Sequence, residues 1–149
     1  MKKLRRKYKI NINKFGNLQL DFQNCFVGSL GYDINYFLYT SLELNVLKLH
    51  YYDLLHSYYV SFEQTLRQCK AEYIPKYNEL CEEITAMQFV GLYAALCEYP
   101  ICCMSLENAE GFTDQSFGTT KHEALYRNAQ VVEMIRYGLD RFEELHVLD

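Results

Sequence analysis

Apolar and polar residues alternate over two short stretches near the start of the chain, residues 8–13 and residues 17–22. A glycine-containing segment, residues 14–17, separates them. Strict alternation around such a segment predicts a β-hairpin with a short turn. Asp21 lies on the polar side of the second predicted strand, near its end. The apolar positions are Tyr8, Ile10, Ile12, Leu18, Leu20 and Phe22.

A helical spacing replaces the alternation from Tyr32 onward, after a glycine-containing segment, residues 24–31, that is typical of a loop. The first predicted helix begins near Tyr32 and is apolar around most of its circumference, which indicates burial on several sides. Thr40 and Glu43 fit a capping box and predict the start of a second helix that ends near Lys70. Its apolar stripe comprises Leu47, Tyr51, Leu54, Leu55, Tyr58, Phe62 and Leu66.

Two further helices follow in the pattern. A third is predicted from Pro75 to about Leu96, with Pro100 bending or ending it. Residues 105–118 are predicted to form a surface loop. Thr120 and Glu123 fit a second capping box and predict the start of a last helix. The apolar positions of that helix are Val131, Ile135, Leu139, Phe142 and Leu145.

Length and composition are those of one globular domain. The chain has 149 residues, of which 50% are hydrophobic, and a domain of this size can bury roughly 70% of its unfolded surface. Seven glycines and two prolines are too few for a tightly turned all-β sandwich. The expected fold class is therefore α+β and mainly helical: an N-terminal β-hairpin followed by a helical bundle.

Charge is distributed unevenly along the chain. Seven of the 15 basic residues precede the first acid, Asp21, and residues 15–149 carry eight basic against 19 acidic side chains, a balance of −11. Residues 1–7 are interpreted as a solvated basic tail. Such a tail can contact phosphates or an anionic membrane, but nucleic acid is not among the expected partners.

The cysteines and the hydropathy of the chain indicate the cellular compartment in which the protein is expected. The six cysteines include no CxxC pair, and the cysteines and histidines show no zinc-site spacing. Nothing after Met1 resembles a secretory leader. We therefore expect buried free thiols and a cytoplasmic location. The apolar stretch from Ile84 to Met104 is interrupted by Gln88, Glu98 and Pro100, which favours a core helix over a membrane span.

Three short sequence motifs indicate a relationship to known proteins more specifically than the periodicity of apolar residues does. They are Leu20-Asp21-Phe22-Gln23, then Gly28-Ser29, and then residues 32–41, which read Tyr-Asp-Ile-Asn-Tyr-Phe-Leu-Tyr-Thr-Ser. This pattern resembles the ecdysteroid kinase-like, or CHK kinase-like, family. These proteins are relatives of choline kinase and the aminoglycoside phosphotransferases, with a protein-kinase-like fold. The resemblance is strongest over residues 10–66, and it implies that residues 1–149 form a single partial domain equivalent to the C-terminal lobe.

The resemblance implies transfer of the γ-phosphoryl group of ATP to a hydroxyl of a small molecule, with ecdysteroids as the best-known substrates. Asp21 would then bind a Mg²⁺ ion that bridges the β- and γ-phosphates. Asp33 would support the catalytic loop through backbone hydrogen bonds. Considered without the family, Asp21 is a solvated carboxylate at a strand end, and Asp33 is a first-turn residue stabilised by the helix dipole.

Two parts of the family pattern are missing from these 149 residues. Family members carry a His-Gly-Asp catalytic loop before the hairpin and an N-terminal lobe with a phosphate-binding lysine, but here no histidine precedes Asp21. We therefore expect a C-terminal fragment that is inactive alone, binds ATP and Mg²⁺ poorly by itself, and uses its small-molecule substrate only in a full-length form. The alternative is a non-catalytic helical module for protein interaction. In either case, self-association or a partner that covers the hairpin face is expected.

Overall fold

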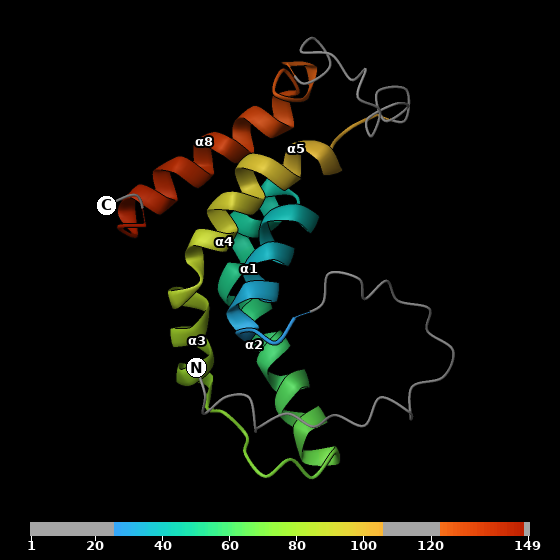
Figure 1. The fold of residues 1–149 in the computed structure, drawn as a ribbon, viewed down its shortest axis with the longest axis vertical. Coiled ribbons are helices and arrows are strands. Elements are labelled where there is room, and N and C mark those ends of the chain that lie inside the picture. The colour runs from blue at the N-terminus through green and yellow to red at the C-terminus, as the bar shows by residue number, and fades with distance from the viewer. Residues whose placement is uncertain (1–25, 106–122, 148–149) are drawn as a thin grey trace.

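The computed structural model describes residues 26–105 and 123–147, in which helices pack into a bundle (Figure 1). In chain order the elements are α1 (Leu30–Ser41), α2 (Leu44–Gln68), α3 (Tyr77–Ala86), α4 (Gln88–Tyr93), the π-helical segment η3 (Ala94–Glu98), α5 (Tyr99–Cys102) and α8 (Ala129–Glu144). Helix α1 contacts α3, α4, η3 and α5, while α8 packs against α2, α4 and η3. The bundle is therefore organised around α1.

The α+β fold class is wrong for the part of the chain that the structure describes. Residues 26–105 and 123–147 form helices and contain no β-strand. The mainly helical character is confirmed. The physical reason is that apolar residues in these ranges recur with helical spacing and bury one another between helices, so this core needs no sheet. The hairpin predicted over residues 8–22 lies outside the described residues, as does the basic tail.

The core lies between α1 and the helices around it. Tyr39 of α1 is 1% exposed, and its ring packs at 5.1 Å from the ring of Phe142 in α8. This contact joins two helices that are far apart in the sequence. The buried apolar residues of the core are Ile34, Leu38, Tyr39, Leu47, Tyr51, Leu55, Leu80, Ile84, Leu92, Ala94, Ala95, Tyr99, Val131, Met134 and Phe142.

Crossed cation–π contacts join α2 to α8. Lys48 of α2 lies 5.2 Å from the ring centre of Tyr137, and Arg141 of α8 lies 4.6 Å from the ring centre of Tyr51. Burial raises the pKa of Tyr51, and the Arg141 guanidinium opposes this rise. These two contacts add electrostatic attraction to the apolar packing of α8 against α2.

The boundary between α1 and α2 differs from the predicted one. Helix α1 continues through Thr40, whose hydroxyl donates to the Tyr36 carbonyl at 2.8 Å. Helix α2 has Glu43 at its N-cap with no side-chain capping bond. The predicted capping box was wrong because the Thr40 side chain bonds back to the preceding turn. The predicted end of α2 is close, since α2 ends at Gln68 and Lys70 has the left-handed φ of 52°.

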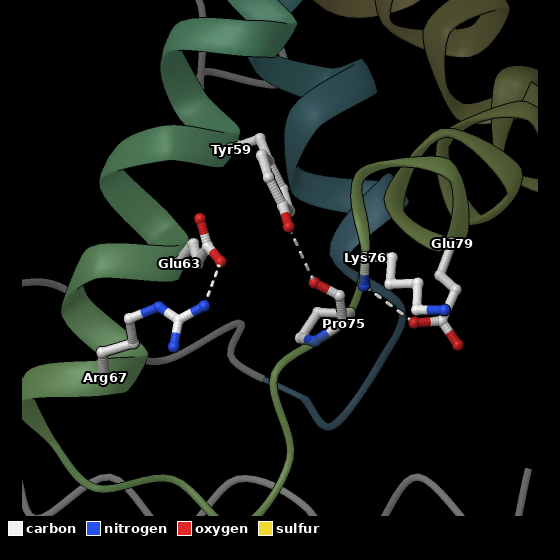
Figure 2. Close-up of polar contacts among 6 residues, drawn as sticks. All are labelled: Tyr59, Glu63, Arg67, Pro75, Lys76 and Glu79. Carbon is white, nitrogen blue, oxygen red and sulfur yellow. Dashed lines mark hydrogen bonds and ion pairs between the residues drawn. The ribbon is translucent and has the colours of Figure 1, made fainter.

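Short polar contacts shape the connection from α2 to α3, as Figure 2 shows. Tyr59 of α2 points its hydroxyl toward the Pro75 carbonyl and donates to it at 3.3 Å. Glu79 accepts the Lys76 backbone N–H at 2.8 Å and so caps the start of α3. Pro75 therefore lies before α3 rather than in its first turn.

The long third helix predicted from Pro75 is broken. Helix α3 ends at Ala86, and the next helical run bends away from it by 55°. Met87, with a φ of −110° and a ψ of 17°, leaves the helical conformation at the break. The periodicity continued across this point because both helices bury apolar residues toward α1.

Pro100 explains the π-helical segment that follows α4. Proline has no backbone N–H, so Pro100 cannot bond the Leu96 carbonyl as an α-helix requires. The Tyr99 N–H instead bonds the Ala94 carbonyl five residues back. The Tyr126 hydroxyl donates to the Leu96 carbonyl at 3.1 Å and so supplies the bond that Pro100 cannot make.

We expect the substitution Tyr126→Phe to lower the free energy of unfolding by about 0.5–1 kcal/mol, because it removes this hydrogen bond from a partly exposed site. Urea unfolding followed by circular dichroism measures the change. Tyr52→Phe is the matched control, since Tyr52 is 72% exposed and should change stability by less than about 0.5 kcal/mol. Equal effects of the two substitutions would contradict the role assigned to Tyr126.

The cysteines only partly follow the prediction. Those within the described ranges carry free thiols, as expected. However, Cys69, Cys97 and Cys102 are exposed. The prediction of burial was wrong for these three because each lies on the outer face or at the end of its helix.

No single helix in residues 26–105 and 123–147 is long and apolar enough to cross a membrane. The bent pair formed by Tyr77–Ala86 and Gln88–Cys102 passes that test only when its two members are taken together.

Candidate functional site

A surface hollow of about 540 Å³ lies at the N-terminal end of α1. It brings together the segment before α1, the first two turns of α1, and residues of α4 and η3 that are some 60 positions later in the chain. Its lining residues are Phe26, Gly28, Ser29, Leu30, Tyr32, Asp33, Tyr36, Tyr93 and Glu98.

Ser29 fixes where α1 begins at the hollow. Its hydroxyl oxygen accepts the Gly31 backbone N–H at 3.0 Å, which makes Ser29 the N-cap of α1. The same hydroxyl donates to the Glu83 carboxylate of α3. The start of α1 is therefore attached to α3, and the side chains of its first turns are held in place.

Asp33 is exposed in the first turn of α1 and lines the hollow. No hydrogen bond or ion pair joins it to another residue of the described ranges. An acidic residue in a first turn interacts favourably with the helix dipole, which agrees with the simpler of the two interpretations. Its predicted role as support for a catalytic loop stays a prediction.

Glu98 of η3 holds two tyrosines of the hollow, Tyr36 of α1 and Tyr93 of α4. The Tyr93 hydroxyl donates to one carboxylate oxygen of Glu98 at 2.8 Å, and the Tyr36 hydroxyl lies 3.5 Å from the other. The hydrogen bond to Glu98 raises the pKa of Tyr93, while burial and then the Glu98 charge raise the pKa of Tyr36. Both rings are therefore neutral phenols at physiological pH.

The sequence pattern did not reveal this cluster. Glu98 was interpreted only as an interruption of an apolar stretch. Tyr93 and Glu98 are five residues apart, a spacing that an α-helix places on different faces. The wider turn of η3 brings them together, and the single available signal was Pro100, which disturbs the helix there.

The described residues do not by themselves make a magnesium site. Asp21, the predicted ligand of Mg²⁺, lies outside them. Within residues 26–105 and 123–147, no group of three or more histidine, cysteine, aspartate or glutamate side chains is placed to hold a metal ion. The role of Asp21 toward Mg²⁺ and ATP, and the poor binding of both expected for this chain alone, therefore stay predictions. The hairpin face, where a partner was expected, also lies outside the described residues.

Comparison with known proteins bears on the family. Residues 14–71 match the model of the ecdysteroid kinase-like family. The resemblance to this family is confirmed over that segment. The match contains Asp21, all of α1 and α2, and the lining residues of the hollow from Phe26 to Tyr36, but it covers less than half of the chain. No curated protein and no solved structure matches the chain significantly.

Proposed function

We propose that this chain is the C-terminal part of an ATP-dependent phosphotransferase that acts on a hydroxyl group of a small molecule, with ecdysteroid-like compounds as the substrate class. The observation that supports this is the family match over residues 14–71. The matched segment contains Asp21, the carboxylate that would bind Mg²⁺, and ends just after α2. Phosphoryl transfer depends on such a ligand because the metal neutralises phosphate charge.

Asp33 has a positioning role in this proposal. It stands exposed at the first turn of α1, eight residues before the end of that helix. Because its carboxylate bonds no other described residue, its oxygens are available to accept backbone N–H groups of a catalytic loop. The loop itself would come from residues outside this sequence, since the 149 residues contain no His-Gly-Asp word.

We also propose that the 149 residues alone do not transfer phosphoryl groups. Their first histidine is His50 in α2, where it lies 3.4 Å from Asp53 on an exposed surface. No histidine is among the described residues that line the hollow. Loss of the catalytic base and of the phosphate-binding lysine each costs orders of magnitude in rate.

Incubation of the purified chain with radiolabelled ATP, Mg²⁺ and a panel of ecdysteroids, choline and aminoglycosides tests the second proposal. We expect no labelled product above the level of the matched Asp21→Asn variant. Turnover by the chain that Asp21→Asn abolishes would contradict the proposed inactivity and would support the phosphotransferase itself.

The reading frame upstream of this sequence tests the first proposal. A His-Gly-Asp word within a few tens of residues is expected there, and the longer protein should phosphorylate a member of the panel in a manner that Asp21→Asn abolishes. A longer protein that contains a His-Gly-Asp motif but transfers no phosphoryl group to any member of the panel would overturn the proposed activity.

A non-catalytic interaction module is the second candidate function. It is favoured by large apolar side chains on the surface: Phe26 is 63% exposed, Val27 is 75% exposed and Phe89 is 67% exposed. Exposed apolar groups of this kind are typical of surfaces that meet a partner. An authentic start of translation at Met1, with no catalytic loop before it, would favour this candidate.

A further inference from the structure

We propose that the hollow at the N-terminal end of α1 binds an organic cation of the alkylammonium type. The proposal concerns binding in the absence of nucleotide and does not depend on the phosphotransferase activity. It rests on the combination of aromatic walls, two carboxylates that form no ion pair with a described residue, and a volume suited to a small ligand.

Four aromatic rings line the hollow, from Phe26, Tyr32, Tyr36 and Tyr93. Phe26 and Tyr32 meet edge to face, with ring centres 5.0 Å apart. The other two rings are held by their hydrogen bonds to Glu98. The faces of such rings carry negative electrostatic potential and attract a cation within about 6 Å.

The charged side chains that line the hollow within residues 26–105 and 123–147 have one sign. This lining includes two carboxylates, Asp33 and Glu98, and no lysine, arginine or histidine from those ranges. Within the described residues, Glu98 accepts hydrogen bonds from the neutral hydroxyls of Tyr36 and Tyr93, which leave its charge in place. The N-terminus of α1 contributes roughly half a positive charge, which offsets only part of the two negative ones. An anionic ligand is therefore disfavoured here.

The size of the hollow also fits a small ligand. Its volume of about 540 Å³ lies within the usual range for small-molecule sites, roughly 300–1,000 Å³. A tetramethylammonium-sized group would have rings on several sides and a carboxylate nearby. A neutral group of the same shape would gain the apolar contact but neither the carboxylate attraction nor the cation–π attraction.

Nuclear magnetic resonance with the complete 149-residue chain tests the proposal. Tetramethylammonium is titrated in one series and tert-butanol, a neutral compound of similar shape, in another. We expect millimolar binding of the cation, at least about tenfold tighter than that of the alcohol. Equal binding of the two compounds would overturn the proposal, because the hollow would then be an apolar depression only.

Substitutions separate the contributions of charge and ring. Asp33→Asn and Glu98→Gln should each weaken cation binding about fivefold, whereas Asp140→Asn, which removes an exposed charge from α8, should not change it. Tyr93→Leu should also weaken binding, whereas Tyr93→Phe, which keeps the ring, should leave it within about twofold.

Circular dichroism of each variant establishes that the helices are intact. Tyr52→Leu is the matched control for loss of an exposed aromatic ring outside the hollow. Binding that survives Asp33→Asn and Glu98→Gln together, or that Tyr52→Leu weakens as much as Tyr93→Leu does, would overturn the assignment to this hollow.

Discussion

Replacing Gly31 by alanine is expected to lower the free energy of unfolding by more than about 3 kcal/mol, enough to unfold much of the chain. Gly31 lies in the first turn of α1, where α1 crosses the C-terminal end of α3. A Cβ atom added there would overlap the Glu83 carbonyl oxygen and would lie 2.6 Å from the Glu83 carbonyl carbon and 3.0 Å from the Ile84 Cα. These are backbone atoms, so no side chain can move aside to make room.

The effect reaches beyond one contact because α1 organises the bundle. Pushing α1 away from α3 would stretch the hydrogen bond that the Asn35 amide donates to the Ile84 carbonyl across this crossing. It would also move Ser29 away from the Glu83 carboxylate. The hollow would lose one wall as a result, so cation binding should be lost together with stability.

Urea unfolding followed by circular dichroism measures the change, and Gly138→Ala in α8 provides the matched control. A Cβ atom at Gly138 would meet its nearest neighbour, the Ala95 Cβ, at 3.6 Å, an ordinary van der Waals distance. Alanine should therefore be tolerated there and could add about 0.5–1 kcal/mol through its helix propensity. Similar destabilisation by both substitutions would show that helix–helix contact at Gly31 is not the cause.

Glycine at this crossing also explains why the start of α1 could not be located from the local sequence. Gly28, Ser29 and Gly31 together indicated a loop, whereas Ser29 caps α1 and Gly31 lies inside it. Glycine has the same local signature whether it provides a turn or allows two helices to approach closely. The difference depends on the backbone of Glu83 in α3, more than 50 positions after Gly31, and so it could not be predicted from the local pattern.

Some of the other helices also follow from the local sequence, whereas some of the helix boundaries do not. The existence of α1, α2 and α8 followed from periodicity, because each helix buries an apolar stripe. The break between α3 and α4 at Met87 did not follow from periodicity, because apolar residues recur with helical spacing on both sides of Met87. Thr40 had the correct residue type for an N-cap, but its hydroxyl bonds backward within α1.

The candidate site was predictable only in part. The resemblance gave Asp21 and Asp33, and residues 14–71 match the family, although Asp21 lies outside the described residues. The hollow beside Asp33 depends on Tyr36 and Glu98, which are 62 positions apart. Neither residue carries a local signal of that contact. The fold, and in particular the π-helical segment η3, brings the two side chains together.

Asn35 provides the second large effect, and Asn35→Asp should lower the free energy of unfolding at neutral pH by about 3 kcal/mol or more. Asn35 is 1% exposed, and its amide donates to the Gly31 carbonyl at 2.7 Å and to the Ile84 carbonyl at 2.9 Å. A carboxylate at this position would have no proton to donate. It would be buried against two carbonyl oxygens that repel its charge.

The destabilisation should depend on pH with a definite sign. Burial against carbonyl oxygens raises the pKa of the introduced carboxyl in the folded state above its unfolded value of about 3.9. Between these two pKa values the folded state binds more protons than the unfolded state. The stability of the Asn35→Asp variant relative to the natural sequence is therefore greatest below about pH 4, where the neutral acid can donate one hydrogen bond, and falls as the pH rises through the folded-state pKa.

Asn35→Leu separates the charge from the lost hydrogen bonds. Leucine has a similar shape and no titratable group, and the Ile84 oxygen keeps its bond from the Met87 N–H at 3.2 Å. Its cost should therefore be about 1–2 kcal/mol and should not change with pH. Urea unfolding of the natural sequence and both variants between pH 4 and pH 8 measures the differences. If the two variants showed the same dependence on pH, the carboxylate at position 35 would have to be solvated, and the tight crossing of α1 over α3 would be wrong.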